Sequence, residues 1–460
     1  MLNGFIYILV ANCINLFISI INGFILPKFL AVETYAFIKM FQLYVQYIGF
    51  FHLGYVDGIY LELGGKDIHE LDKTKLTSQL IFFILFQSVI VMLNFSIGLF
   101  LHDAVLIIFA LNIIPLNVAT LYKYIYQATG EFKKYSRILN LTSILTVTTN
   151  LILLFIFKTQ NYMYYLVSNT LVNMIIVYII HRGIKTIMFN KYDFRFKLSE
   201  QMKYIFDGFF LMIGNFSSIV LTSMDRWFVK LFLTIHDFAF YSFAISIESL
   251  ITTFTTPITI TMYNYFCKNN NEEKITFVRN ILLLAVSVLI SSAFLIKAVI
   301  EVFLVKYTNS IKVIFILFAA QFFSILIKGI YINLYKVEKK QKMYFSKMMF
   351  IVVLGAFLNV LFGYLNNSIE SYALATLLSF IVWFFLCYKD FSNIKYSLKD
   401  MSFIIINIIS FLLLGLNTSY IFGFLVYLII VFSTSFLFFK RETLFILKRI
   451  YNLIFKFLHF

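Results

Sequence analysis

Charged side chains inside long apolar runs are the residues of this sequence with the clearest capacity for chemistry. The segment "SMDRWFVKLF" at 223–232 places Asp225, Arg226 and Lys230 in an otherwise almost wholly apolar stretch, and Glu248 lies in the middle of the next one. Removing a charge from water is costly, so such residues pair with one another, face a water-filled path or bind an ion. The pattern predicts residues that act within a membrane.

Two further polar patterns have helical spacing. In the first apolar run, Asn12, Asn15, Ser19 and Asn22 follow one another at intervals of three, four and three, which keeps them on one helix face. The run that contains Arg226 repeats this pattern from Asn215 through Ser218 and Thr222. In the second run, Lys39, Gln42 and Gln46 share a face. We expect each stripe to face another helix or water.

Purely structural interpretations of these residues stay open. Polar residues in membrane helices often form hydrogen bonds between helices, which would account for any single Asn or Ser. The outer third of the helices, where a long side chain can reach the headgroups, contains Lys39, Arg226, Lys230 and Lys297. Glu248 is the hardest to explain in this way, because it lies close to the midplane.

The composition excludes a water-soluble protein. Of 460 residues, 61% are hydrophobic and 13% charged, and the mean hydropathy is +0.89, which cannot be arranged as an apolar core under a polar surface. With only 3 Pro, the sequence favours packed helices over a β-barrel of short alternating strands. We expect an all-α polytopic membrane protein, with no metal, disulfide or cofactor, because the 3 scattered cysteines match no ligand spacing.

Fourteen apolar runs approach the length of about 20 residues that crosses a hydrocarbon core. They cover approximately 5–26, 35–56, 79–101, 104–127, 138–157, 162–181, 204–233, 238–264, 281–304, 312–336, 348–365, 371–388, 401–417 and 419–439. We interpret the first as a membrane helix and not a removable signal peptide, because no small-residue cleavage site follows it. The thirteenth is short, so a re-entrant pair with the fourteenth stays open.

The positive charges indicate a topology. Most of the 38 Lys and Arg fall in alternate connections and in the C-terminal tail, and such residues collect on the cytoplasmic side of membrane proteins. If all the runs cross, both termini are cytoplasmic, and the net charge of +16 reflects topology and not nucleic-acid binding. The tail "KRETLFILKRIYNLIFKFLHF" reads as a basic amphipathic helix on the inner leaflet, with a frayed tail as the alternative.

An internal repeat divides the chain into two halves. The segment "FLAVETYAF" at 29–37 returns as "FLTIHDFAF" at 232–240, and "YKYIYQATGEFKKY" at 122–135 is echoed by "YINLYKVEKKQKMY" at 331–344. The second pairing aligns Asn112 with Gln321. We predict an N-terminal lobe at 1–190, a C-terminal lobe at 191–390, and two further helices with the tail at 391–460. Six helices in each lobe make the repeats parallel, as in transporters whose substrate path lies between the halves.

Three segments resemble one family. The segments "DRWFVKLFLTIHDFAFYSFA" at 225–244, "HLGYVDGIYLELGGK" at 52–66 and "YQATGEFKKYS" at 126–136 are similar to polysaccharide flippases of the Wzx-like kind, in the MOP (MATE-like) exporter superfamily. The resemblance implies transfer of undecaprenyl-diphosphate-linked oligosaccharide, such as an O-antigen unit, from the inner to the outer leaflet of the bacterial cytoplasmic membrane. It also implies alternating access of the two lobes, coupled to a proton or sodium ion, and contact with membrane lipids and other polysaccharide-assembly proteins.

That function assigns roles to the polar residues as hypotheses. A diphosphate in a low-dielectric region needs cationic donors, for which Lys39 and Arg226 are the leading candidates. The sugar hydroxyls would bind to a set of amide side chains, namely Asn12, Asn15, Gln46 and Asn215. Glu248 and Asp225 are candidates for the coupling ion or for gating salt bridges.

Two other classes stay open. A multidrug or cation exporter of the same superfamily would share the fold but favour an acidic cavity. A polytopic polysaccharide polymerase or lipid-linked sugar transferase would need a substantial loop with acid–base groups, and the longest connection, 182–203, is basic in character. No phosphate-binding loop, zinc motif or nucleophile elbow is present, so we expect a transporter and not an enzyme.

Overall fold

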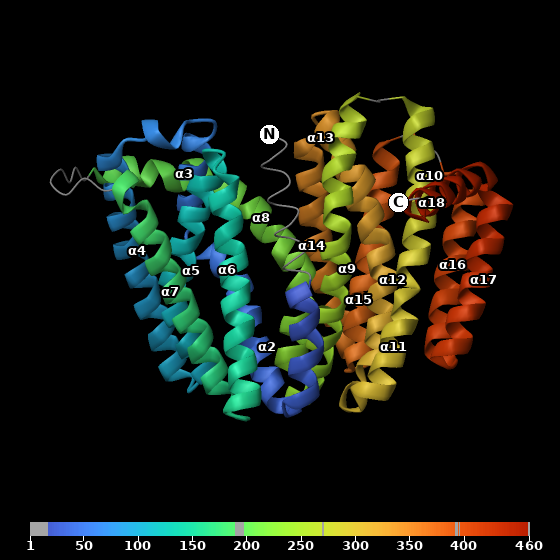
Figure 1. The fold of residues 1–460 in the computed structure, drawn as a ribbon, viewed down its shortest axis with the longest axis horizontal. Coiled ribbons are helices and arrows are strands. Elements are labelled where there is room, and N and C mark those ends of the chain that lie inside the picture. The colour runs from blue at the N-terminus through green and yellow to red at the C-terminus, as the bar shows by residue number, and fades with distance from the viewer. Residues whose placement is uncertain (1–16, 189–196, 269–270, 392–393, 395, 459–460) are drawn as a thin grey trace. The chain divides into compact units, whose positions relative to one another are not determined.

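The computed structural model describes residues 17–188, 197–268, 271–391, 394 and 396–458, and these residues form helices joined by short connections (Figure 1). The predicted all-α polytopic class is confirmed. Among the described residues, 11 helical stretches are long and apolar enough to cross a membrane. The expected positions of Asn12 and Asn15 lie outside the described residues.

The chain packs as two compact units, Met1–Ser223 (unit 1) and Met224–Phe460 (unit 2). The division falls inside one continuous helix, α8, so that its first part belongs to unit 1 and its end to unit 2. Unit 1 contains the helix Phe17–Phe29, α2 (Val32–Gln46), α3 (Tyr55–Leu63), α4 (Lys73–Phe100), α5 (Ala104–Ala128), α6 (Phe132–Leu151), α7 (Tyr162–Met188) and most of α8 (Leu198–Phe232).

Helix α5 is the centre of unit 1 and contacts α2, α3, α4, α6 and α7. Its inner face packs into a core that contains the fully buried Tyr55 of α3 and Phe83 of α4, whose rings stack with centroids 5.3 Å apart. Polar caps start the flanking helices: Asp72 accepts hydrogen bonds from the backbone N–H groups of Thr74 and Lys75, and Asp103 accepts one from Leu106. These caps satisfy donors that a helix start would otherwise leave unpaired.

The second predicted span, 35–56, is wrong as a continuous helix. Helix α2 ends at Gln46, a short 3₁₀ turn covers Ile48–Phe50, and α3 begins again at Tyr55. The break lies at Leu53 and Gly54, whose φ angles of 47° and 85° are in the left-handed region that no α-helix can contain.

The restart of the chain at α3 depends on three glycines. A Cβ atom on Gly58 would lie 2.0 Å from the carbonyl oxygen of Tyr204 in α8, and one on Gly208 would lie 2.0 Å from the carbonyl oxygen of Gly54. Gly54 and Gly58 are four residues apart and therefore on one face, which lets the backbones of α3 and α8 touch. Any side chain at these positions would separate the two helices.

Unit 2 is built around α12, which contacts α9, α10, α11, α15 and α16. Its helices are α9 (Ile235–Lys268), α10 (Glu272–Ile290), α11 (Ser292–Phe303), α12 (Ser310–Leu326), α13 (Ile332–Val337), α14 (Gln341–Leu365), α15 (Ile369–Asp390), α16 (Leu398–Asn417), α17 (Tyr420–Phe438) and α18 (Lys440–Leu458). A π-turn, η5 (Ile327–Tyr331), joins α12 to α13 without breaking the helical path. The predicted span at 281–304 is divided at Ser291 into α10 and α11.

The last helices form a distinct layer of unit 2. Helices α16 and α17 are 20 and 19 residues long, pack side by side (Figure 1) and are each long and apolar enough to span. They are therefore separate helices and not one short re-entrant pair. Helix α18 confirms that the tail is helical, and it contacts α10 and α17.

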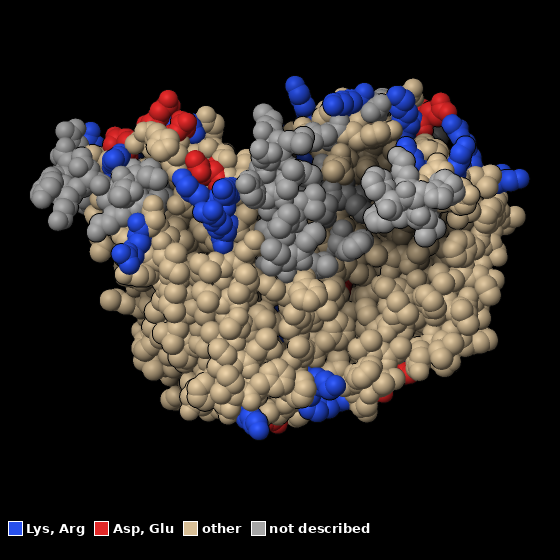
Figure 2. Space-filling view, in the orientation of Figure 1, with Lys and Arg blue, Asp and Glu red and all other residues tan. Residues whose placement is uncertain are grey.

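Charged side chains gather at one end of each unit. Figure 2 shows Lys and Arg near α3 in unit 1 and near α13 and α10 in unit 2, while the middle of the visible face carries almost none. Such a charge-free band is what a hydrocarbon core requires. Figure 2 also shows a few charged side chains along the opposite edge, so charges border the apolar band on both sides, where a membrane would leave them in water.

Candidate functional site

A buried polar cluster in unit 2 contains the charged residues that interrupt the apolar runs. Asp225, near the end of α8, is only 3% exposed. Its carboxylate accepts hydrogen bonds from the Tyr241 hydroxyl of α9 at 2.6 Å, from the Thr376 hydroxyl of α15 at 3.1 Å and from the backbone N–H of Arg226 at 2.8 Å. These donors offset part of the cost of burying the carboxylate. Three helices thus converge on one oxygen-rich position.

Arg226 lies in the same interior. It is 5% exposed, which contradicts the interpretation that its side chain simply reaches out to the headgroups. The neighbouring Lys230 instead lies over the Trp227 ring, 5.2 Å from its centroid. Arg226 therefore contributes a positive charge to the cluster.

Glu248 on α9 completes the cluster. Its carboxylate accepts a hydrogen bond from the amide of Gln321 on α12, and the charges of Asp225, Lys328 and Arg226 act on it. Asp225 and Arg226 are buried, whereas Glu248 and Lys328 are half-buried. Two carboxylates and two cations that lie near one another in this way can exchange partners.

The polar stripe on α2 lies outside the core of unit 1. Gln42 and Gln46 are exposed and Lys39 is half-buried, whereas Tyr35, Leu43 and Tyr44 of the same helix are buried. The Lys39 Nζ donates to Gln42 Oε1 at 3.0 Å and lies 5.2 Å from the centroid of the Tyr35 ring. The stripe keeps its polar groups at the surface of the unit.

The stripe on α8 behaves in the same way. Asn215, Ser218 and Thr222 are exposed. Asn215 makes only a long contact, 3.5 Å, to Asp57 of α3, and Thr222 bonds to carbonyl groups of its own helix. The alternative that these residues hold helices together is therefore weakly supported within unit 1. In the first helix, Ser19 is exposed and Asn22 half-buried.

Of the predicted residues, the structure brings Asp225, Arg226 and Glu248 together in unit 2, and Lys39 and Gln46 onto one face of α2. Tyr241, Thr376 and Asp57 were not predicted. No local pattern marks them, since Thr376 lies 151 residues from the carboxylate that it contacts. Only the general rule that a buried charge needs partners could have prompted a search for them.

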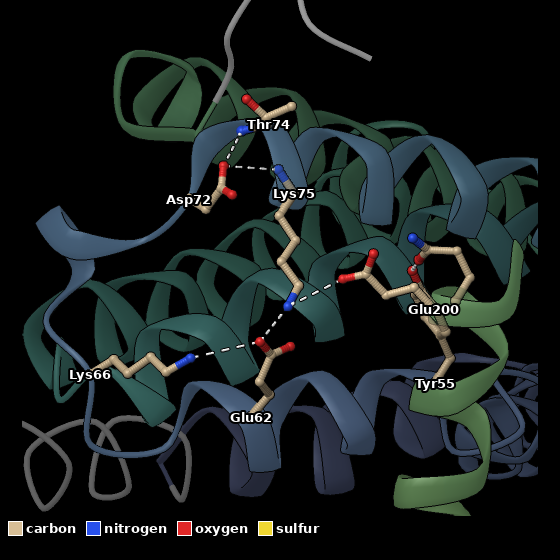
Figure 3. A network of polar contacts seen from close by, with 8 residues as sticks. Tyr55, Glu62, Lys66, Asp72, Thr74, Lys75 and Glu200 are labelled. Atoms are coloured by element: carbon tan, nitrogen blue, oxygen red, sulfur yellow. Dashed lines mark hydrogen bonds and ion pairs between the residues drawn. The ribbon is translucent and has the colours of Figure 1, made fainter. Parts of the chain in front are cut away.

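A second polar network, not predicted, lies in unit 1 at its charged end (Figure 3). Lys75 of α4 donates to Glu62 of α3 at 2.6 Å and lies 3.4 Å from Glu200 of α8, while Lys66 approaches the same Glu62 oxygen at 3.7 Å. Burial alone would raise the pKa of Glu62, but Lys75, the Tyr204 hydroxyl and the charge of Lys66 together outweigh burial and lower it. The network ties three helices of unit 1 together.

Comparison with known proteins identifies the fold. A solved structure described as "Lipid II flippase MurJ, inward closed conformation" is similar with a TM-score of 0.63 and 14% identity, over 96% of this chain and 99% of that chain. The fold is that of the lipid II flippase.

Two other solved structures are similar to a lesser degree. A MOP superfamily transporter from Pyrococcus furiosus has a TM-score of 0.48 and 12% identity over 86% of this chain and 96% of that chain. An outward-facing multidrug resistance MATE family transporter of the MOP superfamily has a TM-score of 0.47 and 12% identity over 85% and 95%. No protein-family model and no curated protein sequence matches the chain.

Proposed function

We propose that the protein is a flippase that moves undecaprenyl-diphosphate-linked oligosaccharide from the inner to the outer leaflet of the bacterial cytoplasmic membrane, by ion-coupled alternating access. The observation that carries the proposal is the α2 stripe of Lys39, Gln42 and Gln46 at the surface of unit 1. In a chain of this composition most of the surface faces lipid, where an amine and two amides would be costly. If the stripe lines a path for a polar substrate, these groups face that substrate and water and not lipid.

The chemistry of the substrate fits this stripe. A diphosphate needs cationic donors away from bulk water, and Lys39 supplies one. Arg226 would supply a second when its own cluster rearranges. The exposed amides of Gln46 and Asn215, together with the predicted Asn12 and Asn15, suit sugar hydroxyls. The flippase that shares the fold is named for lipid II, which supports a lipid-linked substrate here.

Ion coupling is assigned to the buried cluster of unit 2. Asp225 and Glu248 would take up a proton or sodium ion, and the loss or gain of that charge would change which partner Arg226 and Lys328 neutralise. Two carboxylates in one interior also keep a multidrug or cation exporter as the second candidate, because they could bind a cationic drug. Arg226 and Lys328 disfavour it, since they repel such a ligand.

The test is a proteoliposome assay with a defined undecaprenyl-diphosphate oligosaccharide and imposed proton or sodium gradients. We expect Lys39→Gln to slow flipping by about 10- to 100-fold, as befits one lost charge-assisted contact. Lys158→Gln, which removes the same charge from the exposed loop between α6 and α7, is the matched control and should flip at the wild-type rate. We expect Asp225→Asn to remove the response to the gradients.

Three outcomes would oppose the proposal. A folded Lys39→Gln that flips at the wild-type rate would remove the diphosphate role from this residue. Wild-type protein that fails to accelerate flipping under either gradient would reject the function as a whole. Gradient-driven movement of a cationic dye in place of the lipid-linked sugar would establish the second candidate.

A further inference from the structure

A pocket at the charged end of unit 1 belongs to neither the stripes nor the buried cluster. It has a volume of about 260 Å³ and lies between the end of α3, the connection that follows it and the first two turns of α4. Polar side chains from both helices line it, and three leucines form an apolar wall: Glu62, Lys66, Glu70, Asp72, Lys75, Gln79, Leu63, Leu71 and Leu76. Its size is just below that of pockets for drug-sized ligands.

Gln79 makes this pocket unusual. The residue is 2% exposed, yet both its amide nitrogen and its amide oxygen lack a hydrogen-bond partner among the described residues. Glu62 uses one oxygen for Lys75, while its other oxygen, Oε2, is buried without a partner in the same part of the chain. Buried polar groups are nearly always paired, because an unpaired one costs free energy. The lining therefore offers one donor and two acceptors to a ligand.

The unpaired atoms define the chemistry of that ligand. Hydroxyl groups both donate and accept, so neighbouring hydroxyls can bond to Glu62 Oε2 and to both atoms of the Gln79 amide. A carboxylate ion has no proton for Glu62, and both a carboxylate and a phosphate ion would bring negative charge against the three carboxylates of the lining. A cation would leave the Gln79 donor unpaired. No group of acidic, His or Cys residues suited to a metal ion occurs among the described residues.

We propose that this pocket binds a single neutral sugar ring, with Glu62 and Gln79 bonded to its hydroxyl groups and the leucines packed against its carbon face. Lys75 is held by Glu62 and Glu200 (Figure 3), so it fixes the orientation of the Glu62 carboxylate. The identity of the sugar as part of the lipid-linked oligosaccharide rests on the proposed function. The binding of a sugar in this pocket does not depend on that function.

The experiment uses the full chain in lipid nanodiscs and a panel of free neutral hexoses and N-acetylhexosamines, with binding followed by saturation-transfer NMR. We expect at least one sugar of the panel to bind. Gln79→Met should weaken that sugar about tenfold or more, since two hydrogen bonds are lost. Because the Gln79 side chain makes no hydrogen bond within the described residues, and the bond from the Tyr55 hydroxyl goes to its backbone carbonyl, this variant should melt at the wild-type temperature or above it.

Gln87→Met is the matched control. Gln87 lies two turns further along α4, is fully buried and is fully engaged: it donates to the Phe51 carbonyl at 3.0 Å and accepts from Asn117 at 2.7 Å. The same substitution should therefore lower the melting temperature and leave sugar affinity unchanged. Glu62→Gln is a second test of the pocket, and it should weaken the sugar without removing the side chain.

Several results would overturn the inference. If no sugar of the panel binds, water is the occupant of the pocket. Tighter binding of glutamate, glucosamine or inorganic phosphate would contradict a neutral ligand. A Gln79→Met variant that unfolds, or that binds the sugar as the wild type does, would contradict the role of Gln79. The proposed function fails independently: a protein that binds the sugar but flips no lipid-linked oligosaccharide keeps the pocket and loses the transport role. A protein that flips the lipid-linked oligosaccharide but binds no free sugar keeps the transport role and loses the sugar pocket.

Discussion

The central helices of the two units hold equivalent places in the sequence repeat but differ in how completely the chain covers them. In the most apolar 18-residue stretch of α5, 61% of the residues are buried, and Leu111 remains 44% exposed. In the continuous stretch of α12, η5 and α13 the share is 94%. Helix α16 contributes to this difference, because Gly415 lies directly over the ring of Phe315. The added helices therefore enclose one repeat and have no counterpart on the other.

The polar residues differ in the same direction. Asn112 and Gln321 align in the repeat. Asn112 forms hydrogen bonds with Thr170 and Asn173 of α7, whereas Gln321 donates a hydrogen bond to Glu248. Unit 1 thus carries polar stripes at its surface, whereas unit 2 buries the charged residues Asp225 and Arg226. We infer that equivalent positions have separate duties, substrate contact in the first unit and ion coupling in the second.

The largest predicted effect tests how the added helices are attached to unit 2. Arg279 of α10 is 1% exposed, pairs with Asp400 of α16 at 2.8 Å and lies 4.3 Å from the centroid of the Tyr396 ring. We expect Arg279→Leu to lower the free energy of unfolding by about 3–5 kcal/mol, because it leaves a buried carboxylate unpaired. Thermal unfolding in detergent measures the loss.

The control for Arg279→Leu is an exposed ion pair of unit 1. Lys134 and Glu131 lie 3.2 Å apart with roughly a third of each side chain exposed, so Lys134→Gln should cost no more than about 1 kcal/mol. Equal losses for the two variants would show that burial does not distinguish the units.

A smaller effect is expected where α16 covers α12. A Cβ atom on Gly415 would lie 2.1 Å from Cδ1 of Phe315, a ring with no exposed surface in which to move. Gly415→Ala should therefore cost about 1–3 kcal/mol through overpacking. Gly183 of α7 has nothing within 4 Å of such an atom, so Gly183→Ala should instead stabilise unit 1 by up to about 1 kcal/mol. A melting temperature that moves in the same direction for both would contradict the predicted contact.

The smallest effect concerns acid. Glu62 lies in α3, outside the spanning helices, and its pKa is lowered in the folded protein from the ordinary value of 4.5. A lowered pKa adds stability that is complete above pH 4.5 and is lost as the pH falls through the folded value. Between pH 7 and pH 4, wild type should lose slightly more stability than Glu62→Gln, by less than about 1 kcal/mol because the pair is partly exposed to solvent. Parallel melting curves at both pH values would refute the role of the Lys75 contact.

Sequence reasoning located the helices well because the period and length of apolar runs record the thickness of the hydrocarbon core. It failed at 47–54, where a turn is set by the left-handed angles of Leu53 and Gly54, since "FHLGYVDG" remains apolar enough to continue a helix. It singled out Asp225, Arg226 and Glu248, which the structure brings together in unit 2. Their partners could not be predicted, because no local period connects residues such as Asp225 and Thr376 that are far apart in the chain.

The contacts of Lys297 could not be predicted either, because they also join segments that are far apart in the chain. Its place near a helix end suggested a side chain that reaches the headgroups, yet it is 8% exposed and donates to the carbonyl groups of Gly415 and Thr418. These carbonyls lie at the end of α16, where unpaired acceptors carry partial negative charge. A lysine that caps another helix cannot be recognised without knowing that the two helices are neighbours.

The length of helix α8 affects how it can cross a membrane. Its 35 residues amount to about 52 Å of rod, whereas a hydrocarbon core is about 30 Å thick. The excess is accommodated by tilt, and Figure 1 shows α8 running obliquely to α4 and α5 within unit 1. We infer that the thickness of the bilayer, which would set this tilt, acts at once on Glu200 near one end of the rod and on Asp225 near the other.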